Sequence, residues 1–207
     1  MKISVSILNE INNYKEAIKK VNESKSDYIH LDIMDSSFTE KSSFIIDDFK
    51  NIEFDKKADV HLMSNNLDKL IDEYSLLNPE IISFHYEVGN TKKYIEKIKE
   101  KGIKVGLAIN PDTDLNEVKD YLNDIDILLI MSVIPGKGGQ SYISSVTNKI
   151  KEAKKLQKEY RFLIEVDGGI NDKTIKEISD FADIFVSGSY ITNSSNYNEK
   201  IDNLKKC

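Results

Sequence analysis

Four residues of types that bind divalent metal ions lie near the ends of short apolar segments. His30 and Asp32 belong to YIHLDIMD, His61 lies in KADVHLM, and Asp167 ends FLIEVD. Burying a carboxylate costs several kcal/mol unless a partner compensates its charge. Two imidazoles with two carboxylates suit a borderline cation such as Zn2+, Fe2+, Mn2+ or Co2+. We therefore expect His30, Asp32, His61 and Asp167 to form one metal site.

The placement of the histidines and methionines favours a shared site over isolated core residues. All three histidines, at positions 30, 61 and 85, lie near the ends of apolar segments, as do three of the four methionines. Any one of these residues alone is more often a core residue, and a single aspartate more often caps a helix or a turn. Core packing would scatter methionines over all segments. We therefore expect Met34, Met63 and Met131 to line one centre, where thioethers exclude water and offer no protons.

Three glycine-bearing segments follow the last apolar runs: PGKGGQS (135–141), VDGGI (166–170) and SGSYI (187–191). Loops of this kind can present backbone N–H groups to a phosphate. Arg161 is the only arginine, so a backbone cradle is the phosphate site that this sequence can build. Lys137 either adds a positive charge to that cradle or is an ordinary solvated lysine.

These residues need a fold that brings distant segments together. Short β-branched runs alternate with amphipathic helical patterns along the whole chain, eight of each. The runs are ISVSIL (3–8), YIHLDIM (28–34), KADVHLM (57–63), EIISFHY (80–86), IKVGLAI (103–109), IDILLIMSV (125–133), FLIEVD (162–167) and ADIFVSG (182–188). This alternation predicts an α/β protein, a closed (β/α)8 TIM barrel formed by residues 1–207 as a single domain, with function at the C-terminal ends of its strands. A doubly wound sheet is the alternative, but SILNEINN after the first run lacks the glycines of a dinucleotide-binding turn.

The composition argues against a nucleic acid or a membrane as the partner. With 31% charged residues, 40% hydrophobic residues and a net charge of −6, the chain is typical of a globular protein and lacks the basic character of a nucleic-acid binder. Cys207 is the only cysteine, which excludes disulfides and thiolate metal sites and leads us to expect a cytoplasmic location. The apolar N-terminal stretch is too short for a signal peptide, and IDILLIMSVI is too short to span a membrane, so no membrane partner is expected.

In sequence order, the chain resembles the ribulose-phosphate 3-epimerases through SVSIL, HLDIMD, DVHLM, FHYE, GLAINPDT, IMSVIPGKGGQS, EVDGGI and VSGS. The resemblance implies a homo-oligomeric (β/α)8 barrel that interconverts D-ribulose 5-phosphate and D-xylulose 5-phosphate, a small-molecule sugar phosphate step of the pentose phosphate pathway, with one divalent metal ion. It implies that His30, Asp32, His61 and Asp167 bind the metal, and that Asp32 and Asp167 also act as acid and base. The substrate contacts that it implies are Ser6, His61, Gly136, Lys137, Gly138, Gly139, Gly168, Gly169, Gly188 and Ser189. By the same resemblance His85 is a supporting or structural residue and not a ligand.

The chemistry of epimerisation explains the two aspartates. Inverting C3 of a 2-ketose requires a proton to leave one face of the carbon and another to reach the opposite face, so two acid/base groups must flank it. Asp32 and Asp167 come from the second and seventh runs and approach a barrel mouth from different sides. A divalent ion that bridges the ketone and C3 hydroxyl oxygens would act as a Lewis acid and stabilise a cis-enediolate.

Two loops and one position of the first run depart from the family pattern. After Asp35 the family continues with Gly-His-Phe-Val-Pro-Asn, whereas this chain has SSFTEKS and keeps only Phe38; Lys137 replaces an aromatic residue and Val5 replaces a proline. We expect Asp35 to order its loop and not to bind metal. The altered loops leave a sister epimerase of a six-carbon ketose phosphate, such as allulose 6-phosphate, as the alternative.

Two further alternatives differ in reaction or in class. Related barrels that decarboxylate or condense sugar phosphates carry Asp-x-Lys-x-x-Asp, and the corresponding segment here, DIMD, has no lysine. A non-catalytic sugar-phosphate-binding protein is the alternative outside the enzymes. Loss of activity usually removes a metal ligand, and all four are present.

Overall fold

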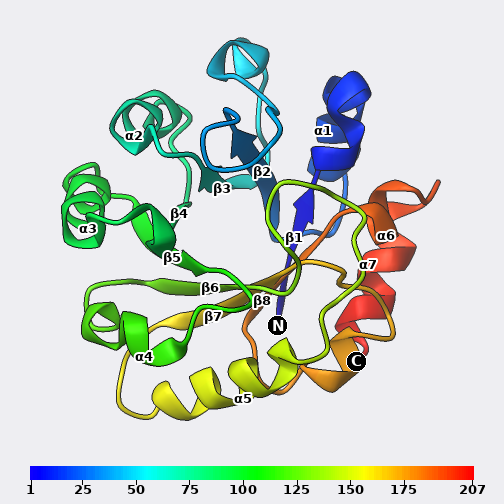
Figure 1. Cartoon of the computed structure of the whole chain (residues 1–207). Helices are drawn as coiled ribbons and strands as arrows, with labels where there is room; N and C mark the ends of the chain where they lie inside the picture. Colours follow the sequence, from blue (N-terminus) through cyan, green and yellow to red (C-terminus); the bar gives the residue numbers. More distant parts are fainter.

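Eight parallel strands close into a barrel in the computed structural model, which describes all of residues 1–207. Each strand pairs with the next, and the last pairs with the first, so the sheet has no edge (Figure 1). The strands are β1 Lys2–Ser6, β2 Tyr28–Met34, β3 Lys57–Met63, β4 Ile81–His85, β5 Lys104–Ile109, β6 Ile127–Met131, β7 Leu163–Asp167 and β8 Ile184–Ser187. The predicted α/β barrel is therefore confirmed: β1 begins one residue before its predicted run, and every other strand lies within its own.

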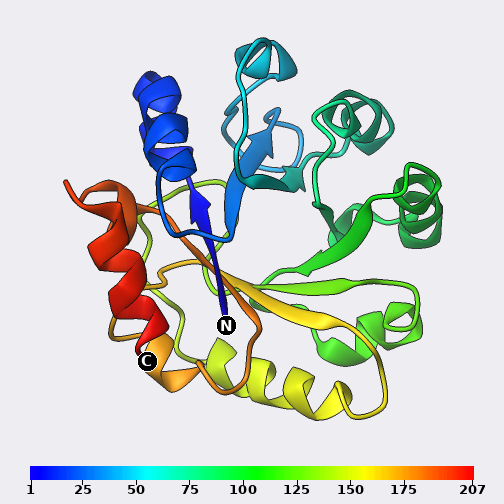
Figure 2. The ribbon, with the colours of Figure 1, turned by 180° about the vertical axis from the view of Figure 1, so that it is seen from behind.

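Helices surround the strands, and the two opposite views show the last helix beside the first (Figure 1, Figure 2). The α-helices are α1 Tyr14–Asn22, α2 Leu67–Ser75, α3 Thr91–Glu100, α4 Leu115–Val118, α5 Val146–Leu156, α6 Ser189–Thr192 and α7 Tyr197–Lys205. Lys25, just after α1, forms an ion pair with Asp202 of α7 at 2.6 Å. None of the helices has the length and apolar content needed to span a bilayer.

The prediction of one helix after every strand is wrong at two connections. Between β2 and β3 the only helical element is the 3-10 helix η2 Ile46–Phe49, and between β7 and β8 it is η5 Ile175–Glu177. Side chains in both connections bond to backbone groups: Ser43 Oγ donates to the carbonyl of Asp32 at 2.6 Å, and Thr174 Oγ1 donates to that of Gly169 at 3.0 Å. Such local bonds compete with helix formation. The remaining 3-10 helices are η1 Leu8–Asn13, η3 Tyr86–Val88 and η4 Lys119–Tyr121.

The helices bury one apolar face each against the outside of the barrel. In α2 the buried side chains are Leu67, Leu70, Ile71 and Tyr74, the three-and-four spacing expected of an amphipathic helix. Branched residues of the strands fill the other side of this layer, so a single large cluster joins helices and barrel. This packing leaves the opposite faces of the strands free to carry polar residues inward.

The register of the strands places those polar residues in layers. Asp32 of β2 lies opposite His61 of β3, and two residues earlier His30 lies opposite Asp59. Met131 of β6 lies opposite Asp167 at the end of β7. Because side chains two residues apart share a face of a strand, the barrel interior ends in a polar layer at the C-terminal side.

Candidate functional site

The four predicted metal ligands meet at the C-terminal end of the barrel. Oδ1 of Asp32 lies 3.5 Å from Nε2 of His30 and 3.5 Å from Nδ1 of His61. Oδ2 of Asp167 lies 3.8 Å from the same nitrogen of His61. One ligand atom from each of the four residues lies within 4.8 Å of the others.

The hydrogen bonds of the two histidines show that this cluster fits a metal ion. His30 and His61 are fully buried, yet Nε2 of His30 and Nδ1 of His61 have no hydrogen-bond partner. The other nitrogen of each ring is paired, with Asp59 for His30 and with His85 for His61. Buried polar atoms without partners are rare and costly. Two such nitrogens facing shared carboxylates therefore fit a Zn2+-like cation, whose protein ligands are imidazole and carboxylate.

The two carboxyl groups of the cluster have opposite shifts in pKa. Burial alone would raise the pKa of Asp32, but the neighbouring His30 and His61 outweigh burial and hold that pKa well below its ordinary value. Burial, together with repulsion from Asp32, raises the pKa of Asp167 to about 7. In the metal-free cluster Asp32 is thus ionised at neutral pH, while Asp167 exchanges between its protonated and ionised forms near pH 7.

A second buried layer lies behind His30 and was missed at the sequence level. Oδ2 of Asp59 lies 2.7 Å from Nδ1 of His30 and accepts the hydroxyl of Ser4 at 2.7 Å. Burial, reinforced by the charge of Asp59, raises the pKa of Glu165 well above its ordinary value. A signal was present: Ser4, Asp59 and Glu165 each precede an expected site residue by two positions, and so share its face of the strand.

A cavity of about 770 Å3 opens above the metal cluster at the C-terminal ends of the strands. It is lined by Asp32, Asp167, Met63 and Met131, and by most of the expected substrate contacts: Ser6, Gly136, Lys137, Gly138, Gly139, Gly168, Gly169, Gly188 and Ser189. His30, His61 and Met34 are buried and do not line it. The structure thus brings the ligands and the glycine loops to one place.

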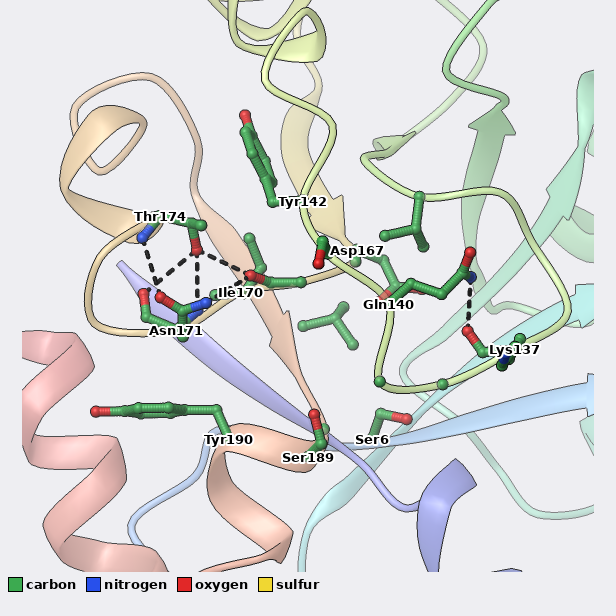
Figure 3. Close-up of a pocket in the computed structure, with 18 of the residues that line it drawn as sticks. Ser6, Lys137, Gln140, Tyr142, Asp167, Ile170, Asn171, Thr174, Ser189 and Tyr190 are labelled. Carbon is green, nitrogen blue, oxygen red and sulfur yellow. Dashed lines mark hydrogen bonds between the residues drawn. The ribbon is translucent and has the colours of Figure 1, made fainter.

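Further cavity residues were not found by sequence reasoning. They include Asn9, Tyr142, Asn171, Thr174, Tyr190 and Asn193, most of them on the loops and short helices after β1, β6, β7 and β8. Figure 3 shows Asn171 and Thr174 held by a network of hydrogen bonds, and Tyr190 lines the same cavity from α6. Loop residues follow no hydrophobic period, so neither strand nor helix patterns reveal them.

The glycine loops are shaped so that the backbone itself lines the cavity. Gly168 has a φ of 123°, and a Cβ there would lie 2.6 Å from a methyl carbon of Val133. No other residue type fits this position without displacing the loop. The loop after β6 is held by Gln140, whose side chain donates to the carbonyl of Ile134 at 2.6 Å. It also donates to the carbonyl of Lys137 at 2.7 Å (Figure 3).

Ser6 and Asp35 support the cluster in different ways. The hydroxyl of Ser6 donates to Oδ2 of Asp32 at 2.7 Å, so this residue contacts a predicted ligand and also lines the cavity. The carboxylate of Asp35 accepts from the backbone and hydroxyl of Ser37, from the Ser64 hydroxyl and from the Asn66 amide. Asp35 therefore ties the loop after β2 to that after β3, in accord with the expected loop-ordering role.

Comparison with known proteins identifies the family. A sequence profile described as the Ribulose-phosphate 3 epimerase family matches residues 2–192. The chain belongs to the ribulose-phosphate 3-epimerase family. A ribulose-phosphate 3-epimerase from Buchnera aphidicola subsp. Baizongia pistaciae is 42% identical over 199 residues, covering 92% of this chain and 87% of the relative. One from Helicobacter pylori is 35% identical and covers 99% of this chain and 97% of the relative.

The family membership makes the protein an enzyme, an epimerase. Solved structures agree on the fold: KGPDC from Streptococcus mutans superimposes with a TM-score of 0.73 over 99% of this chain and 95% of its own, at 14% identity. At that identity the likeness concerns the barrel alone.

Proposed function

We propose that the protein is a metal-dependent ribulose-phosphate 3-epimerase that inverts C3 of a ketose phosphate, converting D-ribulose 5-phosphate to D-xylulose 5-phosphate in the pentose phosphate pathway. The observation that carries the proposal is the meeting of Asp32 and Asp167 on the floor of the cavity, beside the two unpartnered histidine nitrogens. Two acid/base groups and a site for a Lewis acid are what this reaction requires.

In the proposed mechanism the two aspartates move the protons. One carboxylate removes the C3 proton from one face of the carbon, and the other carboxyl delivers a proton to the opposite face. Asp32 belongs to β2 and Asp167 to β7, so the two approach a bound ketose from different strands. Ser6, bonded to Asp32 at 2.7 Å, keeps that carboxylate in a fixed orientation.

His30, Asp32, His61 and Asp167 would hold the divalent ion. Bound there, it supplies Lewis-acid stabilisation of the negative charge that develops on the substrate oxygens as the proton leaves. Met63 and Met131 line the cavity with apolar side chains. They would keep water away from C3 of the substrate once its proton has been removed, so that water does not return a proton to this carbon. The donor set is compatible with Zn2+, Fe2+, Mn2+ and Co2+.

The phosphate of the substrate would lie against the glycine loops. Gly168, Gly169 and Gly188 line the cavity at the ends of β7 and β8, where barrels often present backbone N–H groups to a phosphate. Lys137 is exposed on the cavity rim and forms no ion pair in the protein, so its charge is free to act on an anionic ligand.

Exchange of the C3 proton tests the proposal directly. Purified, metal-loaded protein is incubated with ribulose 5-phosphate in deuterated water, and label at C3 is followed by NMR. We expect exchange that a chelator abolishes and that Mn2+ or Co2+ restores. A parallel incubation with allulose 6-phosphate discriminates the five-carbon from the six-carbon sugar. If stoichiometric metal binds and neither sugar is labelled, the epimerase proposal fails and a non-catalytic binding protein is favoured.

A further inference from the structure

A continuous row of polar side chains leads away from the metal cluster behind His61. Nε2 of His61 lies 2.9 Å from Nε2 of His85, at the end of β4. Nδ1 of His85 lies 3.1 Å from Oε2 of Glu87, in η3. Oε1 of Glu87 accepts the backbone N–H of Asn110 at 2.8 Å and the hydroxyl of Thr113. The row thus runs from β3 to the loop after β5.

The donors at the outer end decide the positions of the protons along this row. The backbone N–H of Asn110 can only donate, so Glu87 acts as an acceptor there. Burial alone would raise the pKa of Glu87, but hydrogen bonds from His85, Asn110 and Thr113 outweigh it and lower that pKa to about 2, so the carboxylate is ionised. Its Oε2 therefore accepts the Nδ1–H of His85, and Nε2 of His85 carries the lone pair. That lone pair accepts the Nε2 proton of His61. The remaining nitrogen of His61, Nδ1, is left with a lone pair that faces Asp32 and Asp167.

Packing fixes the rings of this row in place. His61 and His85 are both fully buried, with ring centroids 5.0 Å apart and an angle of 26° between the planes, so the two rings meet edge to edge at their Nε2 atoms. The ring of Phe38, from the loop after β2, covers His85 at a centroid distance of 4.6 Å. With no solvent at either ring, neither histidine can satisfy its nitrogens with bulk water, so the proton positions follow from the row alone.

The loop that donates to Glu87 at the outer end of the row is held in place by Lys149. The ammonium group of Lys149, in α5, donates to the carbonyls of Asn110 at 3.1 Å and Pro111 at 2.8 Å, and to that of Thr113. The loop that presents the N–H of Asn110 to Glu87 is therefore pinned to a helix. A carboxylate that backs a histidine ligand typically fixes the tautomer and the orientation of its ring.

We propose that His85 and Glu87 are positioning residues that hold His61 in the tautomer with a free Nδ1, the form that binds a metal ion. This inference rests on the proposed metal site and assigns a role to residues that touch neither metal nor substrate. Asp59 hydrogen-bonds directly to the ring of His30 and fixes its tautomer. For His61 the carboxylate of Glu87 acts through the imidazole of His85, which lies between them. The protein thus supports its two histidine ligands in two different ways.

Glu87→Gln is the sharpest test, because one amide cannot replace both functions of the carboxylate. The oxygen of the glutamine is required by the N–H of Asn110, which leaves the NH2 group to face Nδ1 of His85. His85 must then carry its proton on Nε2, and His61 must carry its own on Nδ1, the nitrogen needed by the metal. We expect 15N NMR of the metal-free protein to show His61 changing from the Nε2–H to the Nδ1–H tautomer, and affinity for Co2+ to fall about 10- to 100-fold.

Substitutions of His85 separate the hydrogen bond from the packing. His85→Phe keeps an aromatic ring at this position but removes the acceptor, so Co2+ affinity should fall as in Glu87→Gln. His85→Gln offers an amide oxygen to His61 and an amide N–H to Glu87, and should restore most of the affinity. Glu96→Gln, at an exposed position of α3, is the matched control and should change neither measurement.

The outcomes distinguish this inference from the proposed function. If His61 keeps the Nε2–H tautomer and Co2+ binds with unchanged affinity in both Glu87→Gln and His85→Phe, the positioning role is overturned. If the unsubstituted protein binds no Co2+, the metal site itself fails, while the tautomer measured by NMR still decides the role of His85 and Glu87. Thermal unfolding of each variant shows whether a lost affinity reflects a lost fold, and Glu87→Gln is the decisive variant should His85→Phe not fold.

Discussion

Oδ2 of Asp59 lies 2.7 Å from Nδ1 of His30, and both side chains are fully buried. This contact turns the other nitrogen of the ring, Nε2, toward Asp32. Burial alone would lower the pKa of His30, but the charges of Asp59 and Asp32 outweigh it and raise that pKa well above its ordinary value. If a metal ion binds at Nε2 as proposed, it must displace a proton that the charges of Asp59 and Asp32 favour, and the ion would then compensate both charges.

Asp59→Asn should weaken metal binding without preventing folding. The amide oxygen can still accept from Nδ1 of His30, but the negative charge that increases the basicity of the ring is lost, so we expect Co2+ affinity to fall about 10- to 100-fold. Competition with a coloured chelator measures the affinity. Ser4→Ala is the matched comparison, since it removes a hydroxyl bonded to Asp59 and keeps the carboxylate. Equal losses in the two variants would contradict the charge argument.

Asp167→Asn should reduce C3 exchange by about 100- to 10,000-fold, the usual contribution of one acid/base group. Asparagine has the size of aspartate but can neither remove nor deliver a proton. Because burial and repulsion from Asp32 raise the pKa of Asp167 to about 7, the substitution also relieves an unfavourable contact, and the metal-free variant should unfold at no lower temperature. Asp180→Asn, at an exposed position, is the control. Exchange within a few-fold of normal, with metal still bound, would argue against the acid/base role.

The pH dependence of stability should reveal the Asp35 network. Burial alone would raise the pKa of Asp35, but hydrogen bonds from Ser37, Asn66 and Ser64 outweigh it and lower that pKa to about 2, against an ordinary 3.8. The folded state then binds fewer protons than the unfolded state between these values, so the contribution of the carboxylate is complete above pH about 4 and is lost as the pH falls toward 2.

Asp35→Asn isolates this contribution. Urea unfolding at pH 6 should show the variant less stable than the unsubstituted protein, and at pH 3 the difference in free energy of unfolding should be smaller. The difference must shrink toward low pH, because only the unsubstituted protein has a carboxylate at this position that becomes protonated. A difference that stays constant or widens toward pH 3 would mean that the network does not hold the ionised form.

The sequence predicts the barrel well because strands and helices show periodic patterns of apolar residues. The predicted apolar runs match β2 and β3 to the residue, and the histidines and aspartates near strand ends stand out against apolar neighbours. The connection after β2 was mispredicted as helical, since hydroxyl side chains such as Ser43 bond to the backbone there in ways that spacing does not show. Cavity residues on loops, such as Asn171 and Tyr190, follow no period and emerge only from the folded chain.

The layer behind the ligands was hidden for another reason. Asp59 shares a strand face with His61, and Glu87 lies two positions after His85, so the sequence contained the spacing. What it lacked was the pairing: Asp59 supports His30 on the neighbouring strand, and Glu87 acts through His85 on His61. Partners on different strands depend on register, which a single sequence does not reveal.

Lys137→Met should raise the KM for the sugar phosphate and leave kcat nearly unchanged. The lysine lies on the rim of the cavity, exposed and without an ion pair, and far enough into solvent that its attraction for a phosphate is screened. An exposed ion pair contributes about 0.2 to 1 kcal/mol, which corresponds to a KM higher by about 1.5- to 5-fold. The difference between the two proteins should shrink as salt is added. Lys158→Met, an exposed position outside the cavity lining, is the control, and an equal rise in KM there would show that Lys137 does not contact the phosphate.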